Sequence, residues 1–137
     1  MEGATPARER NFSLLESKLI ATIHEILRRS PHAHVFVVTY PSVLPPTGTC
    51  PQLAIQATDV SLLRDVGTEL AQVTRSAAQI TGVDVVDMAS LSIGHDACSP
   101  EPWVNGATPE RGAPFHPTFA GANATAQQLV RAINRRP

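Results

Sequence analysis

Histidine is the residue type in this sequence best suited to acid–base chemistry, and one of the five histidines has an unusual position. His116 directly precedes Pro117, a residue that fits the first turn of a helix, so its imidazole lies on a loop at the mouth of a helix. The positive end of a helix disfavours a further positive charge, which favours a neutral imidazole able to accept a proton. We predict that His116 is a general base. The alternative is that it only caps or packs against the helix start.

His116 belongs to the longest segment without helical or strand periodicity, residues 94–121, which also holds the only tryptophan. A loop of this length is uncommon in a compact domain unless it has a function. Trp103 is a candidate for lining a substrate pocket, although it could equally pack the loop. His95 and Asp96 are expected to hydrogen-bond within the loop and to hold its shape.

The two cysteines, Cys50 and Cys98, both lie in loops that contain prolines. Because no further cysteine or histidine stands at zinc-finger spacing, a disulfide is favoured over a metal site. Such a bridge would close a loop of about 48 residues and stabilise the fold by ~4 kcal/mol. A metal site built from His95, Cys98 and His116 is the alternative, although its spacing matches no standard zinc pattern.

A serine nucleophile is hard to find in this chain. The segment Ser90-Leu91-Ser92-Ile93-Gly94 is superficially similar to a nucleophile elbow, but the glycine required at position 90 is missing. No crossover helix is predicted directly after it. Ser92 is therefore predicted to be a loop or turn residue.

The elements that must position these residues alternate between helix and strand. Helical periodicity predicts a helix from a capping box at Ser13 to about Arg29 and a second from about Asp59 to Thr81. A third is predicted from Pro117 or Thr118 to about Asn134. Its inward-facing stripe is predicted to contain Phe119, Ala122, Ala126, Leu129, Val130 and Ile133.

Two apolar segments between these helices predict strands, Val35–Tyr40 and Val83–Met88. The first is apolar nearly throughout, which predicts a strand buried on both faces, and the helical crossovers imply parallel pairing. Two strands do not form a stable sheet by themselves. Either another chain completes the sheet, or this chain is the C-terminal part of a larger doubly wound domain. Residues 1–10 are polar and expected to be disordered, which leaves 11–137 for the folded part.

The bulk composition narrows the function further. With 137 residues, 42% hydrophobic content and a net charge of −1, the sequence predicts one folded unit and no nucleic-acid partner. No apolar run is long enough to span a membrane, and the first residues do not form a signal peptide. We expect no cofactor and no resident metal.

Several short motifs, spread from about residue 13 to 135, carry a specific resemblance. They are Tyr40-Pro41, the loop cysteine Cys50, Val83-Asp84-Val85-Val86-Asp87, Gly94-His95-Asp96-Ala97-Cys98, Trp103-Val104, and Phe115-His116-Pro117 with Gly121. Together they resemble the C-terminal half of the SGNH (GDSL-type) serine esterases and lipases, most of all the secreted actinobacterial branch. The resemblance implies a three-layer αβα sandwich with a parallel, flavodoxin-like sheet, of which this chain is the C-terminal α-β-α-β-α part.

The resemblance also implies roles for individual residues. His116 matches the histidine of the family's His-Pro motif, the catalytic base of an ester hydrolase that acts through an acyl-enzyme. The family's acid usually lies three residues earlier, where this chain has Ala113, so the Ala113 carbonyl is expected to orient the Nδ1 proton of His116. The paired loop cysteines of the family imply a Cys50–Cys98 disulfide, and the branch implies an extracellular protein that acts on small-molecule or lipid esters.

The departures from the family pattern concern its N-terminal half. The Gly-Asp-Ser motif with the nucleophile, the oxyanion-hole glycine and the Gly-x-Asn-Asp motif have no counterpart here. The missing N-terminal half of the domain is therefore the expected partner, and this chain alone is expected to be inactive. The alternative is a non-catalytic α/β module that binds a partner through its unpaired strand edge.

Overall fold

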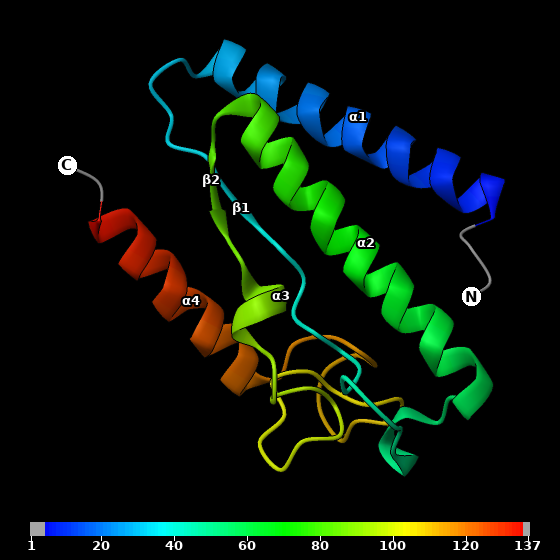
Figure 1. The fold of residues 1–137 in the computed structure, drawn as a ribbon. Coiled ribbons are helices and arrows are strands. Elements are labelled where there is room, and N and C mark those ends of the chain that lie inside the picture. Colours follow the sequence, from blue (N-terminus) through cyan, green and yellow to red (C-terminus); the bar gives the residue numbers. More distant parts are fainter. Residues whose placement is uncertain (1–4, 136–137) are drawn as a thin grey trace.

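The computed structural model describes residues 5–135. Its elements follow one another in the predicted order of helix, strand, helix, strand and helix, with two short helical turns added (Figure 1). The elements are α1 (Pro6–Arg29), β1 (Phe36–Val38), the 3₁₀ turn η1 (Pro51–Leu53), α2 (Ala57–Thr81), β2 (Asp84–Val86), α3 (Met88–Leu91) and α4 (Phe119–Asn134).

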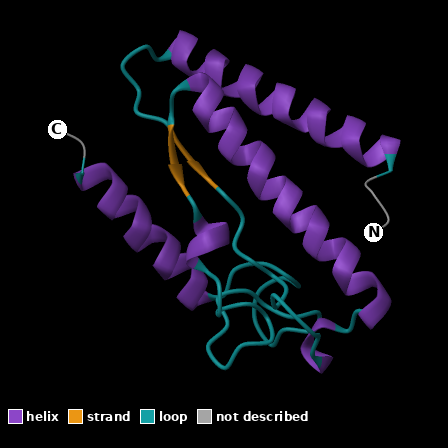
Figure 2. Ribbon diagram, viewed as in Figure 1, coloured by secondary structure: helices purple, strands orange, loops and turns teal. Residues whose placement is uncertain are grey.

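The sheet consists of β1 and β2, which pair in parallel with Phe36 opposite Asp84 and Val38 opposite Val86. In Figure 2 the two strands lie between helices on both sides, with α2 on one side and α4 on the other, and α1 packs along α2. This confirms the predicted α/β class, the parallel pairing and the layered arrangement. The loops gather beyond the carboxyl ends of the strands, where ligands bind in open α/β sheets (Figure 1).

Both strands are shorter than the sequence predicts. Each has three residues, and Met88, predicted to end the second strand, instead begins α3. The chain leaves the sheet at Asp87, whose backbone carbonyl accepts the N–H of Leu91 and so starts a helical turn. The prediction that the first strand is buried on both faces is also wrong, since Val38 is 37% exposed. Burial on both faces would need neighbours that residues 5–135 do not supply.

The N-terminal segment is more ordered than predicted. α1 begins at Pro6 instead of near Ser13, so the expected disorder of residues 1–10 is wrong for residues 6–10. Thr5 caps the helix by accepting the N–H of Arg8 at 3.3 Å, and proline fits the first helical position. Arg8 also forms an ion pair with Glu69 of α2 at 3.0 Å. The expectation for residues 1–4 lies outside the described residues.

The predicted inward face of α4 is mostly open to solvent. Phe119 is 91% exposed, Val130 55% and Ile133 53%, and of the predicted stripe only Leu129 is partly buried. The prediction that this stripe faces inward is therefore wrong within residues 5–135, where α4 contacts β2 and no other described element covers the stripe. Burial of this face therefore depends on something outside residues 5–135.

The core lies between α2, the carboxyl ends of the strands and the loops. Its fully buried apolar side chains come from η1, α2, α3 and the long loop, and they include Leu53, Val60, Ala77, Met88 and Val104. The buried side chain of Val104 thus anchors the long loop in the core. Among the described helices, none combines the length and the apolar character needed to cross a membrane.

Candidate active site

His116 lies in the long loop immediately before α4, and its side chain is exposed. The loop doubles back on itself here, with Val104 and Pro117 forming an antiparallel bridge. The N–H of Asn105 donates to the carbonyl of His116 at 2.9 Å, and the N–H of Thr118 donates to the carbonyl of Trp103 at 2.8 Å. The backbone of His116 is therefore fixed on both sides by the segment 103–105.

The first residues of α4 also fix the backbone around His116. Thr118 is the N-cap, and its hydroxyl accepts the N–H of Gly121 at 3.1 Å while donating to the carbonyl of Pro102 at 3.0 Å. Gly121 packs so tightly that an added Cβ would lie 2.0 Å from the carbonyl oxygen of Trp103. Only glycine allows this close approach. The helix start predicted at Pro117 or Thr118 is thus confirmed, with Thr118 as its cap.

The ring of His116 is oriented by a backbone carbonyl. Its Nδ1 lies 2.8 Å from the carbonyl oxygen of Pro114. Because a carbonyl only accepts hydrogen bonds, the neutral ring that makes this contact carries its proton on Nδ1 and has an unprotonated Nε2. No protein group within residues 5–135 hydrogen-bonds to Nε2. The arrangement leaves Nε2 as an accessible proton acceptor.

The orienting carbonyl is not the one that the sequence predicts. Ala113 was expected to hold Nδ1, but its carbonyl accepts the backbone N–H of His116 at 3.2 Å and the amide of Asn105 at 3.2 Å. Phe115 has a φ of +60°, which is rare for a residue with a bulky side chain and marks a tight turn. The turn brings the carbonyl of Pro114, and not that of Ala113, to the ring.

Tyr40 connects this turn to the sheet. It lies two residues after the end of β1, and its hydroxyl donates to the carbonyl of Phe115 at 2.9 Å. Partial burial raises the pKa of Tyr40 above its ordinary value, so the phenol stays protonated and remains a donor. The carboxyl end of β1 and the loop that carries His116 are thereby tied together across 75 residues of sequence.

Trp103 and His95 form a parallel stack in the long loop, with ring centroids 4.0 Å apart and 4° between their planes. His95 Nδ1 lies 2.9 Å from the carbonyl of Glu101, and buried Asp96 accepts the N–H of Cys98 at 2.9 Å. The expectation that His95 and Asp96 shape the loop is confirmed. Trp103 packs on His95 and does not line the large cavity of the described structure, so its role toward a substrate stays a prediction.

The predicted disulfide is present. Cys50 and Cys98 are bonded across a sequence separation of 48 residues, and they join the proline-rich loop after β1 to the long loop after α3. The alternative in which Cys98 binds a metal with His95 and His116 is thus wrong, because the thiol is consumed. In the described part of the chain, no three His, Cys, Asp or Glu residues gather closely enough to hold a metal ion.

The chain is similar in sequence to known lipases. The chain is 30% identical to Lipase 2 of Streptomyces coelicolor in an alignment 143 residues long that includes 92% of the chain and 48% of that lipase. It is 29% identical to Lipase 1 of the same organism over 110 residues, with 80% and 40% covered. No protein-family model matches the chain.

Solved structures give the same result for the fold. Phospholipase A1 from Streptomyces albidoflavus NA297 superposes with a TM-score of 0.76 at 23% identity, covering 86% of this chain and 50% of that enzyme. An extracellular lipase from Streptomyces rimosus superposes with a TM-score of 0.71 at 25% identity, covering 88% and 50%. The chain is related to the Streptomyces lipases. It spans about half the length of these relatives, and the resemblance to the SGNH esterases and lipases is confirmed.

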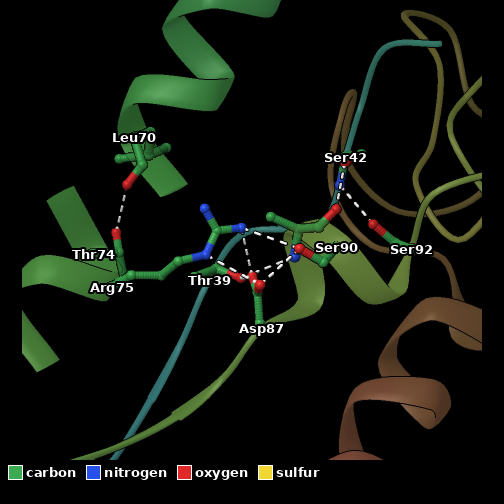
Figure 3. Close-up of polar contacts among 9 residues, drawn as sticks. Thr39, Ser42, Leu70, Thr74, Arg75, Asp87, Ser90 and Ser92 are labelled. Atoms are coloured by element: carbon green, nitrogen blue, oxygen red, sulfur yellow. Dashed lines mark hydrogen bonds and ion pairs between the residues drawn. The ribbon is translucent and has the colours of Figure 1, made fainter. Parts of the chain in front are cut away.

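A cluster of polar side chains around Asp87 was not predicted from the sequence. Asp87 follows β2, and its carboxylate accepts from Thr39 at 2.9 Å, from Arg75 at 2.9 and 3.1 Å and from Ser90 at 2.7 Å (Figure 3). The Thr39 hydroxyl also accepts the N–H of Ala89 at 2.8 Å. Polar residues directly after both strands were the available signal, since the carboxyl ends of parallel strands meet at one edge of the sheet.

The charge of Asp87 is stabilised by these partners. Partial burial raises the pKa of the carboxyl group, but the hydrogen bonds from Arg75, Ser90 and Thr39 and the positive charge of Arg75 outweigh that effect. The net result is a pKa below the ordinary value of 3.8. Asp87 is thus a fixed anion that fastens β1, β2, α2 and α3 together, and its oxygens are occupied by protein donors.

The hydroxyl of Ser92 is not placed to act as a nucleophile. The residue is fully buried and ends α3, and its hydroxyl oxygen accepts the N–H of Ser42 at 2.7 Å (Figure 3). Its prediction as a turn residue is confirmed. Throughout residues 5–135, no serine hydroxyl hydrogen-bonds to Nε2 of His116.

Proposed function

We propose that this chain supplies the general base, His116, to a serine ester hydrolase whose nucleophile comes from the missing half of the domain. The observation that carries the proposal is the exposed His116 ring, held through Nδ1 by the Pro114 carbonyl with Nε2 open. In an acyl-enzyme path, Nε2 takes the proton of the serine hydroxyl and later gives it to the leaving alcohol. A second proton transfer, from water, then releases the acid.

The Pro114 carbonyl serves as the orienting group in this proposal. It fixes the tautomer in which Nε2 is the base, as a carboxylate does in a complete triad. A neutral carbonyl stabilises the imidazolium that forms in the transition state less than a carboxylate does. The rigid attachment of the loop through Asn105 and Thr118 keeps the ring in one place, which is what positioning by a preformed site requires.

The partner in this proposal is the remaining half of the same domain. The relatives are about twice as long as the matched region, which supports a second half that carries the nucleophile and the oxyanion hole. The open stripe of α4 and the two-stranded sheet support a partner of that size. We infer that the complete protein is secreted and acts on small-molecule or lipid esters, and that this chain alone is inactive.

The proposal is tested with a chimera. The half of Streptomyces coelicolor Lipase 2 that has no counterpart in this chain is fused to residues 1–137, and hydrolysis of p-nitrophenyl butyrate is measured. We expect activity in the chimera, none in the isolated chain, and a loss of about 10²–10⁴-fold in kcat for His116→Ala. His24→Ala, on the exposed side of α1, is the matched control and should retain full activity. Turnover by the isolated chain, or an active His116→Ala chimera, would contradict the proposal.

A further inference from the structure

The turn that carries His116 has a backbone conformation that its sequence does not favour. The N–H of His116 donates to the carbonyl of Ala113 at 3.2 Å, which closes a turn with Pro114 and Phe115 at its two central positions. Phe115 has a φ of +60°. Proline first and a positive φ second are the features of a type II turn, in which glycine or asparagine normally fills the second position. A phenylalanine there is strained, so the turn needs support from its surroundings.

The type of turn decides whether the Pro114 carbonyl can reach the imidazole. Types I and II differ mainly by a rotation of the central peptide unit, which here joins Pro114 to Phe115. That peptide carries the carbonyl oxygen that lies 2.8 Å from Nδ1 of His116. Rotation to the type I form, in which Phe115 has a negative φ, would turn this oxygen away from the ring. The left-handed conformation of Phe115 is therefore a condition for the Nδ1-protonated tautomer.

The peptides on either side of this central peptide are held in place. The carbonyl of Ala113 accepts a hydrogen bond from the side-chain amide of Asn105 at 3.2 Å. The carbonyl of Phe115 accepts one from the hydroxyl of Tyr40 at 2.9 Å. Because both neighbouring peptides are fixed, the motion left to the turn is rotation of the central peptide by itself.

Gly106 opposes this rotation. Its carbonyl accepts the N–H of Phe115, which belongs to the central peptide, at 3.3 Å. In the rotated form that N–H would point away from Gly106. Gly106 itself lies against η1, where a Cβ added to it would collide with the carbonyl of Gln52. The N–H of Ala107 donates to that same carbonyl at 2.8 Å. Only glycine allows so close an approach, and the Gly106 carbonyl is thereby held in a fixed place.

We propose that Gly106 is a positioning residue, whose carbonyl keeps the turn in the strained form that prepares His116 as a base. This inference rests on the proposed function, because it assigns a role toward the general base. If the hydrogen bond to Gly106 is lost, Phe115 relaxes to a negative φ and the Pro114 carbonyl leaves Nδ1. The ring is then free to carry its proton on Nε2, and an imidazole protonated there cannot accept a proton at that atom.

The test measures the tautomer of His116 in the isolated 137-residue chain, from the nitrogen chemical shifts of the imidazole ring. The spectra are recorded at about pH 8.5, where histidine side chains are neutral, and the signals are assigned by their loss in His116→Ala. Gly106→Ala should lower the ratio of the Nδ1-protonated to the Nε2-protonated form by about threefold or more, since one hydrogen bond is lost. Gly82→Ala strains a left-handed glycine at the end of α2, and as the matched control it should leave the ratio within about twofold.

Substitution of Phe115 provides a rescue that a general loss of stability would not show. When Phe115→Gly is added to Gly106→Ala, the ratio should return to within about twofold of the parent value, because glycine adopts a positive φ without support. Phe115→Ala removes the same ring but keeps the strain, so it should not restore the ratio. Equal ratios in Gly106→Ala and the parent, or equal rescue by glycine and alanine, would overturn the proposal.

A second pair of variants keeps the test decisive if Gly106→Ala does not fold. In the parent chain, Phe115→Val should lower the ratio, because a β-branched residue strongly disfavours a positive φ, and Phe115→Gly should keep or raise it. A ratio that falls in both variants or in neither would contradict the proposal.

The tautomer is measured without a substrate, so this inference and the proposed function can fail separately. If the ratio follows the predicted pattern while the His116→Ala chimera stays active, the proposed base is wrong and the role of Gly106 in the turn stands. If the ratio does not respond while activity depends on His116, the role of Gly106 is wrong and the proposed base stands.

Discussion

At the scale of single residues, the carboxylate of Asp87 joins segments that are far apart in sequence. It accepts hydrogen bonds from Thr39 after β1, from Arg75 of α2 and from Ser90 of α3 (Figure 3). The ion pair is about one-third exposed, so part of its Coulomb energy is screened by solvent. The Asp87 carboxylate contributes to stability mainly because it accepts hydrogen bonds from several polar groups at once at the carboxyl edge of the sheet.

Asp87→Asn should destabilise the chain by ~1–2 kcal/mol, since hydrogen bonds to a charged group are lost and the exposed pair is screened. The folded-state pKa is lowered, so the stabilisation is fully present above the ordinary value of 3.8 and is lost as the pH falls through the folded-state pKa. Urea unfolding from pH 7 down to pH 3 should show this decline in the parent chain and a flatter curve for Asp87→Asn.

The control for this prediction is Glu25→Gln. The carboxylate of Glu25 accepts hydrogen bonds from Arg28 and Arg29, which lower its pKa, but this carboxylate is exposed on α1. Its removal should change the pH dependence of unfolding much less than removal of Asp87. Identical curves for the parent and Asp87→Asn would show that the cluster does not contribute to stability.

The sequence indicated the residue that carries the proposed chemistry but not the atoms around it. His116 could be selected because its residue type and its place before a helix are legible in the sequence. The carbonyl that orients it depends on the backbone angle of Phe115, and a left-handed phenylalanine has no signal in residue type. The Asp87 cluster is assembled from residues 12 and 48 positions apart, so only the pairing of the strands reveals it.

At the scale of elements, α4 and the segment 102–105 act as one unit. Gly121 in the first turn of α4 lies against the backbone of Trp103, and Thr118 links the same two segments through both its N–H and its hydroxyl. The position of His116 is set by this contact and not by the loop's own conformational preferences. The disulfide between Cys50 and Cys98 then ties the same long loop to the segment after β1.

Gly121→Ala should lower the free energy of unfolding by about 1–3 kcal/mol, because its Cβ would collide with the carbonyl of Trp103. Gly67→Ala, in α2, should instead stabilise by about 0.5–1 kcal/mol, since no atom lies near its Cβ and alanine favours the helix. Urea denaturation of both variants measures the difference. Two glycines in helices would thus respond with opposite signs, and a stabilising Gly121→Ala would contradict the described contact.

Helices were predicted better than strands, for a physical reason. α1 and α2 are long helices of 24 and 25 residues whose apolar residues recur over several turns, and Gly82 ends α2 in the left-handed conformation that glycine favours. The apolar run at 35–40 predicts more strand than forms, because a strand needs hydrogen-bonding neighbours that its own sequence does not show. The start of α1 was missed because the Thr5-Pro6 signal stands in a polar segment.

At the scale of the whole molecule, the described chain has apolar surface that its own elements do not cover. Phe119, Val130 and Ile133 lie along one stripe of α4, and the sheet has two strands where stable parallel sheets have more. The chain matches about half of each related lipase. These observations support the hypothesis that the chain is part of a domain and that another polypeptide segment completes it.

Replacing Phe119, Val130 and Ile133 together with serine should reduce self-association of the isolated chain, because exposed apolar stripes drive contact between copies. Sedimentation velocity over a series of concentrations measures the effect. Gln127→Ser, at an exposed polar position of the same helix, should leave the association unchanged. A parent chain that stays monomeric throughout the series would contradict the account of an uncovered face.

The most direct test of the central claim is rescue of the chimeric His116→Ala enzyme by free imidazole. His116 is exposed, so imidazole can diffuse into the space left by the substitution. If His116 is the general base, kcat/KM for p-nitrophenyl butyrate should fall by about 10²–10⁴-fold and then rise with imidazole concentration. If the activity is unchanged by the substitution, or is lost and does not respond to imidazole while the chimera stays folded, His116 is not the base.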